Sequence, residues 1–323
     1  MSGATFNVVT FMLIFLVSEN FLWLAFPLVF LNGFSGTCAG MTSVLYAEVT
    51  SNDAKWYTYH TSTISLSWFF GSLFGGIFID IMGVANLYIF VLIFSLLNTV
   101  LSIFIQENRE EIIQINQKLS QEKKLEITLN ADIKLRELKK NSPYLNTGLF
   151  FRSLGARPIL VSLAIFFSFT LTSDSHIGFL ISVNPLIQTF FSLIIGRLIK
   201  RQNFKFFLTI GYFLSTLAMV GYYFSTEFWG LLVSQVLVCV SYVLFWNATF
   251  IYINQNTTPT NKGRYVTVAV SFFYLGSFIG DILMGVVLLI RSDYYFAILI
   301  MMIFPSVSAL VLLFGFRLKS KEV

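Results

Sequence analysis

The sequence has little charge, little cysteine and little histidine. Charged residues make up 11% of its 323 residues, whereas a soluble globular chain carries about 25%. That shortage excludes an ordinary soluble domain. The two cysteines, Cys38 and Cys239, lie inside apolar runs, and the two histidines, His60 and His176, are far apart along the chain. The sequence therefore supports neither a disulfide framework nor a metal site, and we expect no cofactor.

Long apolar runs make up most of the chain. Hydrophobic residues account for 56% of it and the mean hydropathy is +0.77. Many runs approach the length of about 20 residues that a helix needs to cross a bilayer. We predict an all-α integral membrane protein with about ten transmembrane helices in two bundles. The expected spans are residues 2–18, 21–47, 59–82 and 87–105, then 158–172, 177–199, 204–224, 228–253, 265–290 and 294–316.

The segment 106–157 differs from the rest because it is charged. It holds ten of the 21 Lys and Arg residues and seven of the 16 acids. We predict an incomplete four-helix bundle over 1–105, a cytoplasmic linker over 106–157 that is partly amphipathic helix or solvated chain, and a six-helix bundle over 158–323. The fifth span would begin near Leu149 instead if Arg152 and Arg157 snorkel to the interface.

The basic residues predict an orientation. If the linker is cytoplasmic, 20 of the 21 Lys and Arg residues fall on that side, and Arg291 alone lies outside. Basic loops are retained on the cytoplasmic side. We therefore expect a multi-pass protein of the cell membrane with both termini in the cytoplasm.

Two stretches repeat at an offset of 205 residues. SWFFGSLFGGIF (67–78) aligns with FFYLGSFIGDIL (272–283), so that Gly71 meets Gly276, Gly75 meets Gly280 and Gly76 meets Asp281. Glycines four residues apart let helix backbones approach closely. Their recurrence in two halves indicates parallel structural repeats.

These motifs together resemble the major facilitator superfamily of secondary transporters. GFSGTCAGMTSVLYAEVT (33–50) looks like its fourth helix and following turn, GSLFGG like its fifth and GSFIGD like its eleventh. GRLIKRQNFK (196–205) resembles the cytoplasmic latch loop after its eighth helix. Gly196 and Arg201 match that loop, whereas Lys200 replaces the expected acid. Asn203 replaces a later glycine, and an asparagine can still adopt a left-handed turn there.

The resemblance implies two six-helix halves, of which this chain carries the third through twelfth helices. We therefore expect an N-terminally truncated member. The fifth span also looks shortened, because about 20 residues separate Pro158 from Gly178.

Polar residues inside the spans are the candidates for a substrate path. Asp281 could couple transport to a proton, or could be hydrogen-bonded to a neighbouring helix. Gln235, Tyr242 and Trp246 share one helix face, next to Asn247. Asn32, Asn184 and Gln188 could contribute as well, although isolated amides also serve as interhelical hydrogen-bond partners.

The sequence favours secondary transport of a small solute by rocking of two halves about a midplane site. The expected partners are the lipid bilayer, an unidentified small molecule and a coupling proton, with no nucleic acid. The alternative is a degenerate member that binds or scaffolds without transporting. An enzyme is disfavoured because no nucleophile, base and acid are grouped in the sequence.

Overall fold

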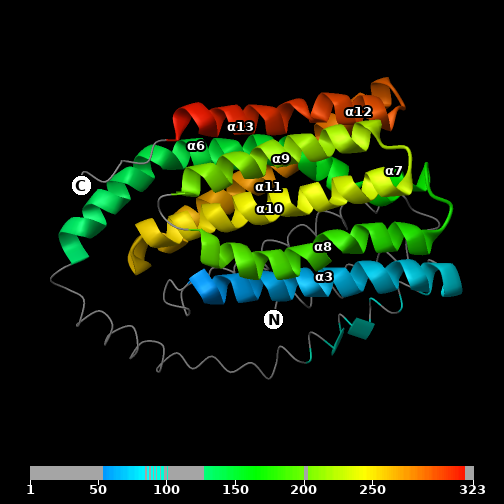
Figure 1. The fold of residues 1–323 in the computed structure, drawn as a ribbon, viewed down its shortest axis with the longest axis horizontal. Coiled ribbons are helices and arrows are strands. Elements are labelled where there is room, and N and C mark those ends of the chain that lie inside the picture. Colours follow the sequence, from blue (N-terminus) through cyan, green and yellow to red (C-terminus); the bar gives the residue numbers. More distant parts are fainter. Residues whose placement is uncertain are drawn as a thin grey trace. The chain divides into compact units, whose positions relative to one another are not determined.

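The computed structural model describes residues 54–83, isolated positions between 86 and 100, and residues 127–199 and 203–316 (Figure 1). Over these residues it contains helices and no strand. The helices are α3 (Ala54–Met82), α6 (Ile127–Val161), α7 (Leu163–Ser168), α8 (Asp174–Leu198), α9 (Phe204–Phe224), α10 (Phe228–Asn256), α11 (Pro259–Ile290), α12 (Tyr294–Met301) and α13 (Ile303–Gly315).

Six of the described helical stretches are long and apolar enough to cross a membrane. They are Ser62–Met82, Asp174–Leu198, Phe204–Phe224, Phe228–Asn256, Asn261–Ile290 and Tyr294–Gly315. Each coincides with a span expected from the sequence, which confirms an all-α membrane protein. The expected spans 2–18 and 21–47 lie outside the described residues, and 87–105 is described only at isolated positions.

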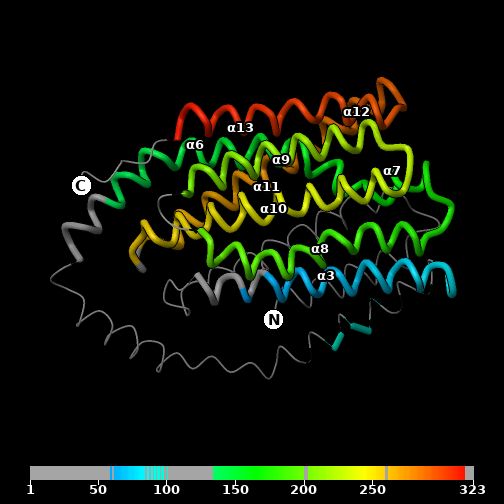
Figure 2. The backbone as a smooth tube through the Cα atoms, in the orientation of Figure 1, coloured from blue at the N-terminus to red at the C-terminus, as the bar shows by residue number. Residues whose placement is uncertain are grey.

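The chain divides into two units. One consists of Met1–Val49 with Ile77–Glu126, and the other of Thr50–Gly76 with Ile127–Val323. The packing described below lies within the second unit. There, α6 packs against α11 and α13, α9 packs against α10 and α13, and α8 packs against α10 (Figure 2).

Helix α6 crosses the expected domain boundary. It begins at Ile127, so the predicted change from linker to bundle between Arg157 and Pro158 falls inside one helix. The reason is a buried stripe along it at spacings of three, four and seven, namely Leu138, Leu145, Leu149, Arg152, Ala156 and Ile159. One face of a charged sequence is enough to pack into a bundle.

A hydrogen bond ties the same helix to α10. Asn141 Nδ2 donates to the Tyr252 hydroxyl at 2.9 Å, and Asn141 and Tyr252 are both buried. Asn141, which lies in the predicted linker, therefore belongs to the interior of the bundle, as the amphipathic-helix interpretation of that segment allows.

Helices α3 and α8 pack closely through glycine. A Cβ added to Gly76 would lie 2.7 Å from the Asp174 carbonyl oxygen, and one added to Gly178 would lie 2.8 Å from Gly76 Cα. Eleven residues further along α8, the Ser62 hydroxyl donates to the Thr189 carbonyl at 2.9 Å. Because residue 62 pairs with 189 and residue 76 with 178, the two helices are antiparallel.

The second glycine pair meets α6. A Cβ on Gly276 would collide with the Phe150 carbonyl, and one on Gly280 with the Leu154 carbonyl. Around Gly71 and Gly75, by contrast, no described atom lies within 4 Å of an added Cβ. Glycines at equivalent positions of the two repeats thus have different surroundings.

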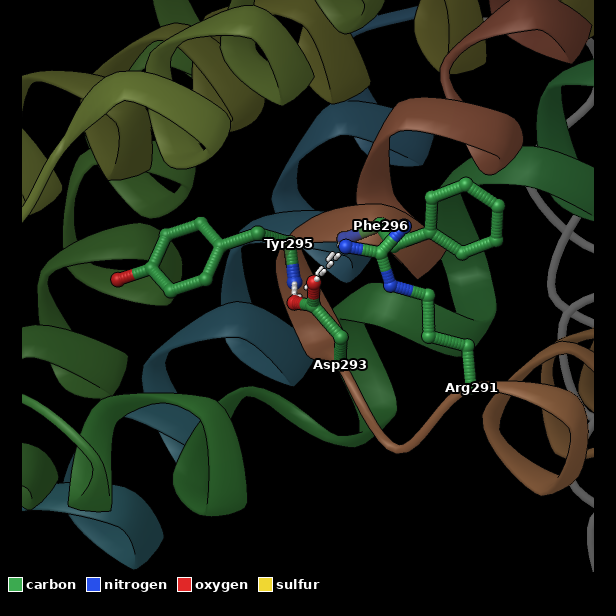
Figure 3. A network of polar contacts seen from close by, with 4 residues as sticks. All are labelled: Arg291, Asp293, Tyr295 and Phe296. Carbon is green, nitrogen blue, oxygen red and sulfur yellow. Dashed lines mark hydrogen bonds and ion pairs between the residues drawn. The ribbon is translucent and has the colours of Figure 1, made fainter.

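A short turn joins α11 to α12 (Figure 3). Asp293 Oδ1 accepts hydrogen bonds from the backbone N–H groups of Tyr295 at 2.9 Å and Phe296 at 3.3 Å, which caps α12. The Asp293 carboxylate also pairs with Arg291 at 3.3 Å, and the Arg291 guanidinium lies over the Phe296 ring. These contacts satisfy backbone donors that an uncapped helix leaves open.

Candidate functional site

A cavity of about 340 Å³ lies within the second unit, between α3, α6, α8 and α10. Its volume falls in the range of about 300–1,000 Å³ that is typical of small-molecule sites. The lining residues come from four helices and from the start of α7. They are Ser67, Trp68, Gly71, Ser72, Arg152, Arg157, Leu160, Leu163, Ile181, Asn184, Pro185, Gln188, Gln235, Val238 and Tyr242.

The cavity lies at mid-depth of α8. In α8, Asn184 is ten residues after Asp174 and Gln188 is ten residues before Leu198. At a rise of 1.5 Å per residue, each amide is about 15 Å from one end of the helix. Both side chains are therefore well inside a bilayer about 30 Å thick.

Arg152 is the most unusual lining residue. Its side chain is 0% exposed, and it does not snorkel as the sequence allowed. Its Nε donates to the Ser215 hydroxyl at 3.2 Å, and Ser215 in turn shares a hydrogen bond with Ser241. Its Nη1 and Nη2 atoms are buried and have no hydrogen-bond partner among the described residues.

An aromatic ring supports the same guanidinium. Its central carbon lies 4.5 Å from the Phe245 ring centroid and 5.8 Å from that of Tyr242. A charge at mid-span costs about 2.5–3.5 kcal/mol on insertion scales, and a cation–π contact returns about 0.5–2 kcal/mol. Two of the three guanidinium nitrogens remain without a hydrogen-bond partner among the described residues.

Arg157 brings a second positive charge to the cavity from the same helix. It is partly buried, its Nε has no hydrogen-bond partner among the described residues, and its guanidinium lies 5.7 Å from the Phe273 ring centroid. None of the described residues that line the cavity is acidic. The described part of the cavity is therefore electropositive.

Amide side chains line the same cavity as the arginines. Gln235 of α10 is 0% exposed, and neither its Oε1 nor its Nε2 has a hydrogen-bond partner among the described residues. Gln235, Val238 and Tyr242 are three and four residues apart, so one face of α10 lines the cavity. Asn184 and Gln188 do the same for α8. A buried amide without a partner is costly, which indicates that a group outside the described residues forms hydrogen bonds with it.

Four of the predicted site residues thus come together in one cavity: Gln235, Tyr242, Asn184 and Gln188. Trp246 does not line the cavity but stacks on Tyr242, with ring centroids 5.4 Å apart. Asn247 is buried elsewhere on α10, and both of its amide atoms lack partners in the described structure. Asn32 lies outside the described residues.

Asp281 stands apart from this group. It is exposed on α11 and does not line the cavity. The positive charge of Arg157 acts on its carboxylate, but the two side chains form no ion pair in the described structure.

The predicted latch loop is described only in part. Gly196 lies in the last turn of α8, whereas Lys200 and Arg201 lie outside the described residues. Asn203 does not adopt the left-handed conformation that an asparagine permits there, because its φ is −112°. Its Nδ2 instead donates to the Leu198 carbonyl at 3.0 Å and so bridges α8 and α9.

Sequence reasoning missed Arg152 and Arg157 as site residues. The signal was present, since both arginines interrupt the apolar run that continues into α7, and a charge within a span indicates function. The dense charge just before them led to their assignment to the linker. Ser67, Trp68 and Ser72 were missed because small polar and aromatic residues are common in membrane helices.

Comparisons with known proteins agree with this architecture. The family model described as Major Facilitator Superfamily matches residues 145–323. An uncharacterized MFS-type transporter of Yersinia enterocolitica is 29% identical over 121 residues, which cover 38% of this chain and 29% of that protein. One of Yersinia pseudotuberculosis is 29% identical over 96 residues, which cover 30% and 25% respectively. The matched stretches span less than a third of the length of these relatives.

Proposed function

The chain belongs to the Major Facilitator Superfamily, and on that premise we propose that it carries a small solute across a membrane through the cavity between α3, α6, α8 and α10. The observation that supports this most directly is the buried Gln235, whose amide faces a mid-depth cavity without any described partner. A solute that makes those hydrogen bonds would replace the missing partners.

We further propose that transport proceeds by alternating access. In transporters built from repeats, a midplane site is exposed to each side in turn as the repeats rock around it. The close glycine contacts between α3 and α8, and between α11 and α6, favour rigid helix groups. Such groups can rock while keeping their internal packing.

The membrane and the orientation belong to the same proposal. We place the chain in the cell membrane with both termini in the cytoplasm, supported by the distribution of Lys and Arg among its loops. The loop that contains Gly196, Lys200 and Arg201 would then act as a latch on the cytoplasmic side.

Transport can be tested with the purified full chain in liposomes. Uptake and counterflow would be measured for a panel of radiolabelled solutes, with Gln235→Leu as the test variant. Gln255→Leu is the matched control, because Gln255 lies on the same helix but is exposed. We expect Gln235→Leu to abolish flux while Gln255→Leu retains it.

The same experiment separates transport from the alternative, a membrane protein that binds without transporting. Binding of a solute to the purified protein, with no flux in liposomes, would reject transport. Flux that is unchanged in Gln235→Leu would reject this cavity as the path.

A further inference from the structure

We propose that the solute is a small organic anion, held in the cavity by the free guanidinium edge of Arg152 together with Arg157. This inference rests on the proposed transport function and names its substrate class. The juxtaposition that carries it is a fully buried arginine with two unpartnered nitrogens in a cavity whose described lining contains no acid.

The contacts of Arg152 leave one edge free for a ligand. The Nε–H group donates a hydrogen bond to the Ser215 hydroxyl, and the Phe245 ring covers one face of the guanidinium. What remains is the pair of Nη atoms. Two parallel N–H groups in a plane match the two oxygens of a carboxylate or a phosphate.

Arg157 strengthens the preference for negative charge. Two like charges in one apolar enclosure destabilise each other, and an anion between them relieves that repulsion. Asp281 partly balances Arg157 from α11 but forms no ion pair with it, and Arg152 has no acidic partner among the described residues.

The rest of the lining favours an organic molecule over a bare ion. Trp68, Leu160, Leu163, Ile181 and Val238 supply apolar surface, and Tyr242 supplies an aromatic face. Gln235, Gln188 and Asn184 supply hydrogen-bonding groups in the same lining. A carboxylate or phosphate ester with a compact apolar or hydroxylated body suits that arrangement.

The inference can be tested with matched pairs of probes on the purified full chain. Benzoate would be compared with benzamide, and glucose 6-phosphate with glucose, by calorimetry and by thermal stabilisation. We expect the anion of at least one pair to bind at least about tenfold more tightly than its neutral counterpart. The pair that responds distinguishes a carboxylate from a phosphate site.

Substitutions then assign the preference to these arginines. We expect Arg152→Gln to remove the preference for the anion and Arg152→Lys to retain part of it, because lysine keeps the charge but lacks the planar fork. Arg197→Gln is the control, since Arg197 is exposed at the end of α8. If Arg152→Gln does not fold, Arg157→Gln makes the same test at a partly buried position.

A measurement without any solute gives an independent check. Because Arg152 has no acidic partner among the described residues, Arg152→Met should raise or preserve the midpoint of thermal unfolding. A fall larger than the loss of the Ser215 hydrogen bond and the Phe245 contact accounts for would mean that an acid of the chain compensates Arg152, and would overturn the inference. Equal binding of anions and neutral probes, or an unchanged preference in both arginine variants, would also overturn it.

These results remain distinguishable from those for transport itself. Flux of a neutral solute that depends on Gln235 but on neither arginine would reject the anion site and keep the transport function. Arginine-dependent binding of an anion without flux would keep the site and reject transport.

Discussion

The guanidinium of Arg152 lies 4.5 Å from the centroid of the Phe245 ring. Arg152 comes from the charged part of α6 and Phe245 from the middle of the apolar helix α10. Phe245 also stacks on Tyr212 at 5.1 Å. One ring thus connects α6, α9 and α10 next to Arg152, which lines the cavity.

Replacing that ring should weaken the bundle. Phe245→Leu removes the cation–π contact and the stacking on Tyr212, so we expect the free energy of unfolding to fall by about 1–3 kcal/mol. Thermal unfolding of the purified protein measures this. Phe213→Leu is the control, because Phe213 is exposed on α9, and it should change stability by less than about 0.5 kcal/mol.

The neighbouring glycines Gly75 and Gly76 should respond oppositely to the same substitution. Gly76→Ala places a Cβ 2.7 Å from the Asp174 carbonyl, and such overpacking costs about 1–3 kcal/mol. Gly75→Ala meets no described atom within 4 Å and should gain up to about 1 kcal/mol in helix propensity. Equal losses of stability in the two variants would show that Gly75 also faces a close partner.

The early part of α6 should behave as bundle core. Leu138→Ala truncates a side chain that is 0% exposed, and we expect a loss of about 2–5 kcal/mol in unfolding free energy. Lys139→Ala, one residue later and exposed, should be nearly neutral. If both variants have similar stability in chemical denaturation, this part of α6 is a linker and does not belong to the core of the bundle.

Asp281 offers a test of proton coupling. If its carboxylate carries the coupling proton, Asp281→Asn should make uptake insensitive to an imposed pH gradient across liposomes. Asp174→Asn, at an exposed acid in the first turn of α8, should keep the response. An unchanged response in Asp281→Asn would remove Asp281 from the coupling mechanism.

The cap of α12 predicts a smaller effect. Asp293→Ala would leave the N–H groups of Tyr295 and Phe296 without their acceptor (Figure 3). Losing such a cap costs about 0.5–2 kcal/mol, which thermal unfolding can detect. Asp293→Asn should recover much of that loss, because an amide oxygen also caps a helix.

The sequence by itself determined the class of the protein, the places of six described spans and four residues of the cavity. It could do so because hydropathy averaged over about 20 residues depends on composition alone. The i, i+3/i+4 spacing likewise places Gln235 and Tyr242 on one face of α10 before any packing is known.

Only the tertiary structure decided the role of residues 127–157. Averaged over a window, that segment is charged, yet one of its faces carries Leu138, Leu145 and Leu149 into the bundle. The same folding buries Arg152 in the lining of the cavity that Gln235 also lines, although 83 residues separate them in the sequence. A charge near the end of an apolar run can lie in water or in the core, and the outcome depends on which neighbouring helices cover it.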